Sequence, residues 1–244
     1  MCFRLPGTAT SYLNAVLAAT TNTGNFTVLY AIRQTVDLDA ASGEIEFKAV
    51  GEANVHGKAS GGDGTTWFQY VNWGGEASPS IARVQNTWEW YAWRGYAGPP
   101  DTLLVSRSSD DAEDTWTDWT PALSQNSFDI ESIRFGDNNR GEPIGADFAA
   151  IRIWAGIRLS DAQLSAERNS ITPVITSGLT LDKFGTGANL AAALAAGTGT
   201  LTAGGVVTLH ADMPVAPYQN LSPGGIILPP RFNGGYSNLS GYLQ

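Results

Sequence analysis

Residues 145–167, "GADFAAIRIWAGIRLSDAQLSAE", join a strand to a short helix, and this junction constrains the fold more than any other segment. Up to Trp154 the segment is rich in β-branched and aromatic residues, and beyond it the pattern becomes helical. Ser160 can accept a hydrogen bond from the backbone of Gln163, whose side chain can bond back to the backbone of Ser160. We therefore expect a strand followed at once by a capped helix over residues 160–168.

The rest of the chain is dominated by short strand patterns. Residues 26–34, "FTVLYAIRQ", alternate between two faces, one of them strongly apolar. Further strand candidates occupy residues 43–51, 66–73, 80–85, 88–95, 102–107, 115–120, 127–136 and 147–156. No long helical pattern separates one strand from the next, so the sequence predicts an all-β, antiparallel sandwich rather than parallel βαβ units.

The strand patterns also predict side-chain directions. Residues 43–51 should turn Ile45, Phe47 and Ala49 inward and Glu44, Glu46 and Lys48 towards solvent. The apolar parity slips within residues 127–136 and again within 147–156, and one bulge in each strand would explain the slip.

Composition restricts the partners. The chain has 23 acidic and 14 basic residues, a formal net charge of -9, which disfavours nucleic acid and anionic membrane surfaces. Its one cysteine, Cys2, excludes an intrachain disulfide and a cysteine-rich metal site. His56 and His210 are far apart, and neither belongs to a metal or nucleophile motif. There is no secretion-signal pattern and no long apolar run, so we expect a protein made in the cytosol with no membrane partner.

The composition changes near the end of the chain, which predicts two parts. From residue 214 onward there are five of the 12 prolines, and Arg231 is the only charged residue. We expect residues 1–213 to form the β-sandwich and residues 214–244 to form an extended Pro/Gly-rich C-terminal arm.

The junction segment also resembles a known family. Ile151–Trp154, followed by Leu159–Ala162, resembles the closing motif of the laminin-G-like, or concanavalin A-like, lectin and glucanase superfamily. Ala149 and Ala150 replace the acidic residue that the family has before this strand. "FRLPGTATSYLNAV" and "NFTVLYAIRQT" are similar to early strands of the family, so the resemblance spans about residues 1–173. It implies an antiparallel jelly-roll of two curved sheets.

The resemblance implies functions as well. Such domains without a signal peptide are common among structural proteins of tailed phages. We therefore expect a non-enzymatic virion protein, a capsid decoration or tail/fibre component, that forms homo-oligomers and contacts other virion proteins through residues 214–244. A carbohydrate-binding module or adhesin outside a virion is the alternative. A glycosidase is the third possibility, but Lys48 follows Glu44 and Glu46 where the glucanases of the family have a further carboxylate.

Candidate binding residues come from two compositional features. Sugars stack on aromatic rings while amides hold their hydroxyls, so the glycan-binding candidates are Trp67, Trp73, Trp93, Tyr96, Asn138 and Asn139. Packing in the core or between subunits is the alternative role for the aromatic residues. The acidic run at 108–114 offers oxygen ligands for Ca²⁺ at Asp110, Asp111 and Asp114, or is a solvated loop. No other cofactor is expected.

Overall fold

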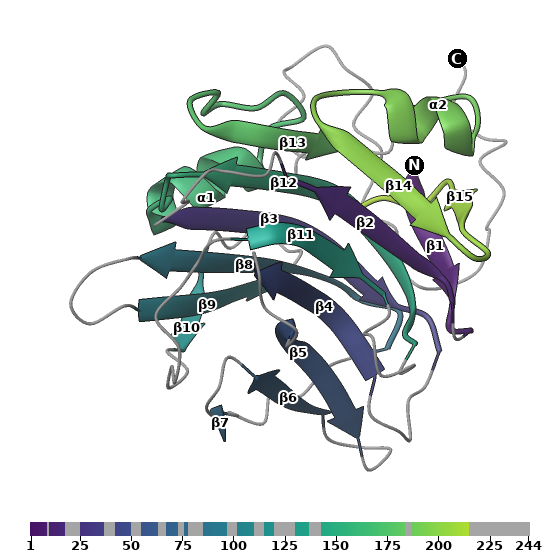
Figure 1. The fold of residues 1–244 in the computed structure, drawn as a ribbon, viewed down its shortest axis with the longest axis horizontal. Helices are drawn as coiled ribbons and strands as arrows, with labels where there is room; N and C mark the ends of the chain where they lie inside the picture. Colours follow the sequence, from purple (N-terminus) through teal and green to yellow (C-terminus); the bar gives the residue numbers. More distant parts are fainter. Residues whose placement is uncertain are drawn as a thin grey trace, which may run out of the picture.

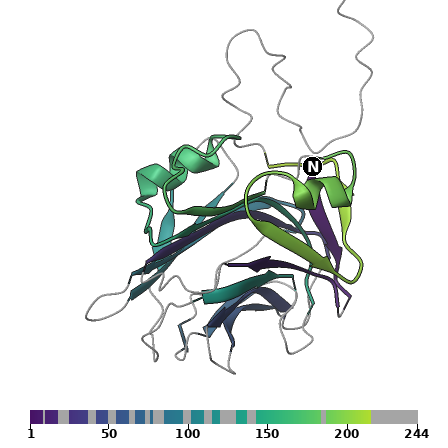
Figure 2. The same cartoon turned by 45° about the horizontal axis from the view of Figure 1, so that its top comes forward.

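The computed structural model describes residues 1–8, 10–17, 25–36, 42–49, 55–62, 67–72, 76–77, 85–96, 102–109, 115–119, 130–136, 143–183 and 187–214. Within these ranges the chain forms two antiparallel sheets that face each other, as Figures 1 and 2 show. The predicted all-β sandwich is therefore confirmed. None of the helices in these ranges is long and apolar enough to span a membrane.

The eight-stranded sheet is built around two long central strands. In spatial order it contains β10 (Thr117–Trp119), β9 (Thr102–Ser109), β8 (Trp88–Tyr96), β3 (Phe26–Gln34), β12 (Gly145–Ala155), β1 (Cys2–Pro6) and β15 (Thr208–His210), and β13 (Leu179–Lys183) also pairs with β12. The strand predicted at 26–34 is β3, with the same bounds. β1 pairs with the first half of β12 and β13 with the second half, so β12 organises this side of the sheet.

The seven-stranded sheet forms the second layer. Its spatial order is β14 (Thr200–Gly204), β2 (Tyr12–Val16), β11 (Ile130–Phe135), β4 (Ser42–Ala49), β5 (Val55–Gly62), β6 (Trp67–Asn72) and β7 (Glu76–Ala77). β14 pairs with β2, and β15 pairs with β1. Segments beyond residue 173, where the family resemblance ends, therefore belong to both sheets.

The main core fills the space between the sheets. Phe47 and Phe135 of the seven-stranded sheet meet Trp93 and Phe148 of the other, with ring centroids 5.1 Å apart for Phe47–Trp93 and 5.8 Å for Phe135–Phe148. Alternate residues of each strand point into this space because side chains change face at every residue. Each sheet therefore buries the apolar side chains of one face away from water.

A second buried cluster lies on the outer face of the eight-stranded sheet. Trp90, Trp154, Leu159 and Leu164 belong to it, and helix α1 (Asp161–Arg168) covers it (Figure 2). The expected cap is present, since the Ser160 hydroxyl accepts from the Gln163 backbone at 3.3 Å and the Gln163 side chain accepts from the Ser160 backbone at 2.8 Å. A shorter helix, α2 (Leu190–Ala195), follows β13.

A buried arginine ties α1 to the sheet. Arg152 of β12 donates to the Glu167 carboxylate at 2.7 Å and to the Asp182 carboxylate at 2.9 Å. Arg152 and Glu167 are both fully buried, so each charge needs the other. This network fixes the strand-to-helix junction that the sequence predicted.

Bulges occur where the parity slips, but one was not foreseen. The register shifts between Ile130 and Ser132 and between Ala149 and Arg152, as expected, and Ala150 has a positive φ of 52°. The register of β4 against β5 also shifts between Gly43 and Ile45. Because of this shift the prediction for Glu44 was wrong: its side chain is buried and accepts a hydrogen bond from the Tyr30 hydroxyl at 2.6 Å. Glu46 was also expected to face solvent, but it is only 6% exposed.

Candidate functional site

A row of polar side chains crosses the outer face of the seven-stranded sheet. Thr202 of β14 lies opposite Asn14, Asn14 opposite Arg134, and Arg134 opposite Glu46. Residues directly opposite in an antiparallel pair share one face of the sheet. We call these four residues, Asn14, Glu46, Arg134 and Thr202, the polar belt.

The strands place the belt outside because their alternate residues form the core. Leu13 and Ala15 flank Asn14, and both are buried between the sheets. Ile45 and Phe47 flank Glu46 in the same way. The backbone register continues the row to Gly57, Asn72 and Glu76 at the far edge. Six strand spacings separate β14 from β7, or about 29 Å.

An aromatic ring lies next to the belt. The guanidinium carbon of Arg134 is 4.2 Å from the ring centroid of Tyr12, a cation–π contact. The ring also lies against Gly204, because a Cβ built on Gly204 would be only 2.3 Å from Cζ of Tyr12. Gly204 thus leaves the room in which the tyrosine ring packs against β14.

The belt and this ring carry the groups that a sugar needs. Amide, guanidinium, hydroxyl and carboxylate groups can together donate to and accept from hydroxyls. An aromatic ring can pack against the apolar face of a pyranose. In the adjacent rows, Lys48 and Glu131 form an exposed ion pair at 3.1 Å, and Val16 is half exposed. This side of the sheet is polar and mixed in charge; Thr202 is exposed, Asn14 and Arg134 are half-buried, and Glu46 is buried.

The structure separates the predicted glycan-binding residues. Trp93 is fully buried and its indole donates to the Tyr30 hydroxyl at 3.4 Å, so its prediction as a surface residue was wrong. It lies on the inward parity of β8, where a large ring fills the core. Tyr96 is 44% exposed at the end of β8, and the guanidinium of Arg158 lies 5.8 Å from its ring centroid.

Of the other predicted site residues, only the strand position of Trp67 is described. Trp67 is the first residue of β6. The remaining glycan and calcium candidates lie outside the described residues, and these are Trp73, Asn138, Asn139, Asp110, Asp111 and Asp114. The belt itself was missed because its members share a face only through strand register, which no local pattern shows.

The two carboxylates of β4 do not converge. Glu44 enters the core at the bulge, where it contacts Tyr30, whereas Glu46 belongs to the outer row of the same strand. Burial, followed by the effect of the Glu44 charge, raises the pKa of Tyr30 well above 10. The third function, a glycosidase with Glu44 and Glu46 in one cleft, does not fit this arrangement because the pair lies on opposite faces of the strand.

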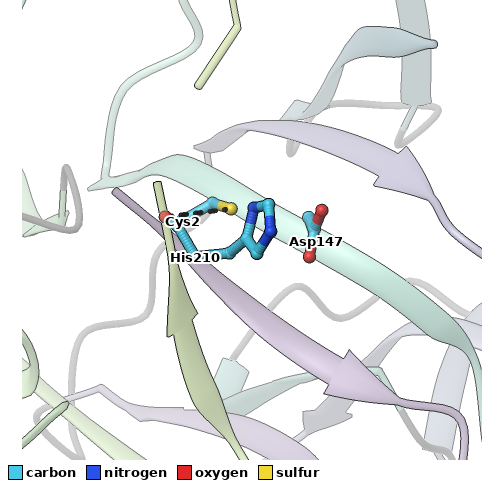
Figure 3. A group of neighbouring side chains, drawn as sticks. All are labelled: Cys2, Asp147 and His210. Atoms are coloured by element: carbon cyan, nitrogen blue, oxygen red, sulfur yellow. Dashed lines mark hydrogen bonds between the residues drawn. The ribbon is translucent and has the colours of Figure 1, made fainter. Parts of the chain in front are cut away.

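A second polar group lies on the outer face of the eight-stranded sheet. The thiol of Cys2, the carboxylate of Asp147 and the imidazole of His210 have ligand atoms within 4.8 Å of one another. Figure 3 shows the His210 ring between the other two side chains. Burial, followed by the negative charge of Asp147, raises the pKa of the Cys2 thiol to about 12.

Arginines neutralise the carboxylate in this group. Asp147 is fully buried and accepts from Arg4 at 2.7 and 2.8 Å and from Arg33 at 2.5 and 3.1 Å. Arg33 also forms a 3.0 Å ion pair with Asp212. Sequence reasoning could not find this group, because Cys2 and His210 are 208 residues apart and meet only through the β1–β15 pairing.

Comparisons with known proteins extend these observations. No protein-family model and no curated protein matches the sequence. The native heptameric SAP-like pentraxin from Limulus polyphemus is similar in structure, with a TM-score of 0.55 and 12% identity over 84% of this chain and 92% of that one. A proposed carbohydrate-binding protein from Bacteroides ovatus gives 0.54 and 17% over 87% of this chain and 62% of that one.

A phage protein is also among the similar structures. The enzymatically active domain of tailspike protein 2 of bacteriophage CBA120 gives a TM-score of 0.53 and 13% identity over 70% of this chain. This chain spans only 28% of that protein and 62% of the Bacteroides protein. At such identities the comparisons show the fold, which is the concanavalin A-like jelly-roll that the closing motif predicted.

Proposed function

We propose that this protein binds glycans through the polar belt and the neighbouring Tyr12 ring. The observation that carries this proposal is the row of Asn14, Glu46, Arg134 and Thr202 on the outer face of one sheet, of which Thr202 is exposed, Asn14 and Arg134 are half-buried and Glu46 is buried. The Tyr12–Arg134 contact supports it, since the guanidinium over the ring places an aromatic and a charged group together beside hydrogen-bonding groups. A belt that crosses several strands suits an extended oligosaccharide rather than a single sugar.

The setting that we propose is the surface of a phage virion. Two observations support it: the fold also occurs in a phage tailspike, and residues 214–244 are rich in proline and glycine with one charged residue, the composition expected of an extended arm. In this proposal the C-terminal residues contact other virion proteins, and the protein is a homo-oligomer that decorates the capsid or belongs to a tail or fibre. An adhesin or carbohydrate-binding module outside a virion remains the alternative, and immunogold labelling of purified particles separates the two.

We propose binding without catalysis. Solved structures of similar fold include both enzymes and binding proteins, so the fold does not decide this question. The proposal is supported by the separation of Glu44 and Glu46 on opposite faces of β4. Incubating the glycans that bind with the protein and measuring released reducing ends tests it, and hydrolysis would contradict it.

Two matched tyrosine–arginine pairs allow a sharp test of the binding site. Tyr12 and Arg134 lie at the belt, whereas Tyr96 and Arg158 form a similar pair at the end of β8. We expect Tyr12→Ala and Arg134→Ala to reduce binding on a glycan array about tenfold or more, a loss of at least ~1.4 kcal/mol. Tyr96→Ala and Arg158→Ala should leave binding unchanged.

Each outcome of this test has a meaning. Loss of binding in the Tyr96 and Arg158 variants alone would move the site to the end of β8, where Tyr96, one of the candidates from the sequence, lies. No binding to any glycan by the wild-type chain would reject the proposed function. Repeating the measurement with Ca²⁺ and with a chelator tests the calcium expectation for Asp110, Asp111 and Asp114, which predicts weaker binding after chelation.

A further inference from the structure

We propose that Cys2, Asp147 and His210 form a binding site for one zinc-like transition-metal ion. This site is independent of the proposed glycan site, because it lies on the outer face of the other sheet. Three strands bring its residues together: β1 carries Cys2, β12 carries Asp147 and β15 carries His210. Cys2 lies opposite His210 in the register of β1 with β15, and Asp147 lies opposite Arg4, two residues from Cys2.

The distances between the three ligand atoms are slightly longer than in a metal-bound site, so small side-chain movements would be needed to bind the ion. The sulfur, nitrogen and oxygen atoms lie within 4.8 Å of one another. Ligands of a tetrahedral zinc ion, at about 2.0–2.3 Å from the metal, are separated by about 3.5 Å. Side-chain rotations that bring the atoms together by about 1 Å would complete the geometry. In Figure 3 the His210 ring lies between the Cys2 sulfur and the Asp147 carboxylate.

The ligand types select the ion. Thiolate and imidazole groups favour Zn²⁺ and related transition metals, whereas Ca²⁺ and Mg²⁺ require oxygen ligands. Three protein ligands leave a fourth position for water, as in zinc sites with an open position. The same site therefore should not account for any calcium dependence of glycan binding.

The surrounding residues hold the ligands in place. Of the hydrogen bonds to Asp147, Oδ1 accepts only the one from Nε of Arg4, while Oδ2 accepts three. A carboxylate has about four acceptor positions, and Oδ1 keeps one that can reach a metal. Asp212 contacts Nδ1 of His210 through its backbone at 3.3 Å and its carboxylate at 3.4 Å. Binding of the ion through Nε2 requires the tautomer with the proton on Nδ1, which the neighbouring Asp212 carboxylate can accept as a hydrogen bond.

The charges set the strength of the site. Binding replaces the proton of the Cys2 thiol by the metal and releases that proton to solvent. The thiol gives up only a weak 3.7 Å hydrogen bond to the carbonyl of His210. Arg4 and Arg33 add two positive charges beside Asp147, so we expect weaker binding than in structural zinc sites.

Titration of the full chain with Co²⁺ and then Zn²⁺ tests the proposal. We expect one Co²⁺ per chain, a near-ultraviolet thiolate-to-cobalt absorption band, and displacement of Co²⁺ by Zn²⁺. Cys2→Ser should abolish the band, and both Cys2→Ser and His210→Ala should weaken Zn²⁺ binding about tenfold or more. His56→Ala, which changes the other histidine of the chain, is the matched control. It should retain the cobalt absorption band and the affinity for Zn²⁺.

The outcomes that would overturn the site are distinct. Absence of the thiolate band in the wild-type chain would overturn it, and so would Zn²⁺ binding that is unchanged in Cys2→Ser. Circular dichroism and thermal unfolding without metal establish that each variant is folded. If His210→Ala is unfolded, His210→Gln is measured instead, because it retains a side chain that can contact Asp212.

Discussion

At the scale of single residues, the least expected feature is a set of polar groups inside the sandwich. Tyr30 donates to Glu44 at 2.6 Å, and the neighbouring Tyr91 donates to Glu89 at 3.2 Å. The two tyrosine rings stack with centroids 5.9 Å apart, and Glu89 also pairs with Arg107. A buried carboxylate is stable only with such donors, because burial without them costs several kcal/mol. These contacts therefore fix side-chain positions in the core.

Tyr30→Phe tests this conclusion directly. The substitution keeps the ring but removes a donor from the buried Glu44 carboxylate, so we expect the free energy of unfolding to fall by about 2 kcal/mol. Tyr91→Phe is the matched control and should cost less, because Glu89 keeps its ion pair with Arg107. Urea unfolding followed by tryptophan fluorescence measures both. Equal losses in the two variants would contradict the assigned importance of the Tyr30–Glu44 bond.

The raised pKa of Tyr30 predicts a pH dependence with a definite sign. Above about pH 10 tyrosine loses its proton in the unfolded chain, whereas Tyr30 stays protonated in the folded chain. The folded state then binds one more proton, so its contribution to stability is full below pH 10 and decreases as the pH rises. The slope is at most about 1.4 kcal/mol per pH unit.

Unfolding measurements at pH 8, 9, 10 and 11 check this slope. Above pH 10 the free energy of unfolding should fall more for the wild-type chain than for Tyr30→Phe. The difference in stability between the two proteins should therefore become smaller as the pH rises. Parallel pH curves for the two proteins would contradict the prediction, since every other titrating group is common to both.

At the scale of secondary-structure elements, the sequence predicted those features that are determined by residues close together in the chain. The strand at 26–34, the helix after Ser160 and two of the bulges follow from periodicity and capping residues. The bulge at Gly43–Ile45 was missed because "GEIEFKAV" has an uninterrupted alternation that gives no sign of a shift. Trp93 was misplaced because its strand is buried on both faces, which alternation alone cannot reveal.

The cap of α1 gives a prediction at this scale. Ser160→Ala removes the acceptor for the Gln163 backbone and should lower the free energy of unfolding by about 1 kcal/mol. Ser160→Asp should retain most of the stability, because aspartate also accepts this hydrogen bond. Ser177→Ala, at an exposed serine beyond the helix, is the control and should change little. Chemical unfolding of the three variants measures these differences, and a neutral Ser160→Ala would show that the cap is dispensable.

At the scale of the whole molecule, the two ends of the described chain complete the sheets. β1 lies between β12 and β15, and β2 lies between β11 and β14. The family motif predicted the jelly-roll, but neither the polar belt nor the Cys2–His210 contact could be derived from it. Both depend on the register of strands that are distant in sequence, and register is set by the packed structure. The polar belt and the metal site therefore depend on the folded structure, whereas the architecture follows from the sequence motif.

The described chain contacts the sandwich as far as Pro214, and two truncations test the predicted division at residue 213. His210 pairs with β1, Asp212 forms a 3.0 Å ion pair with Arg33, Met213 packs on the outer cluster and Pro214 is buried. A chain ending at Pro214 keeps these contacts, so its melting temperature should stay within about 2 °C of the full chain. A chain ending at Val206 loses β15 and the Arg33–Asp212 ion pair. We expect this loss to lower the free energy of unfolding by about 2 kcal/mol and the melting temperature by about 4–8 °C.

Analytical ultracentrifugation of the same proteins tests the role of the C-terminal residues. If residues 214–244 carry the contacts between copies or to virion proteins, the chain ending at Pro214 should be folded but monomeric, while the full chain associates. Unfolding of that truncated chain would contradict the division at residue 213, because it would make the last 30 residues part of the domain. Unchanged association would instead place the contacts on the sheets, since no other part of the chain differs between the two proteins.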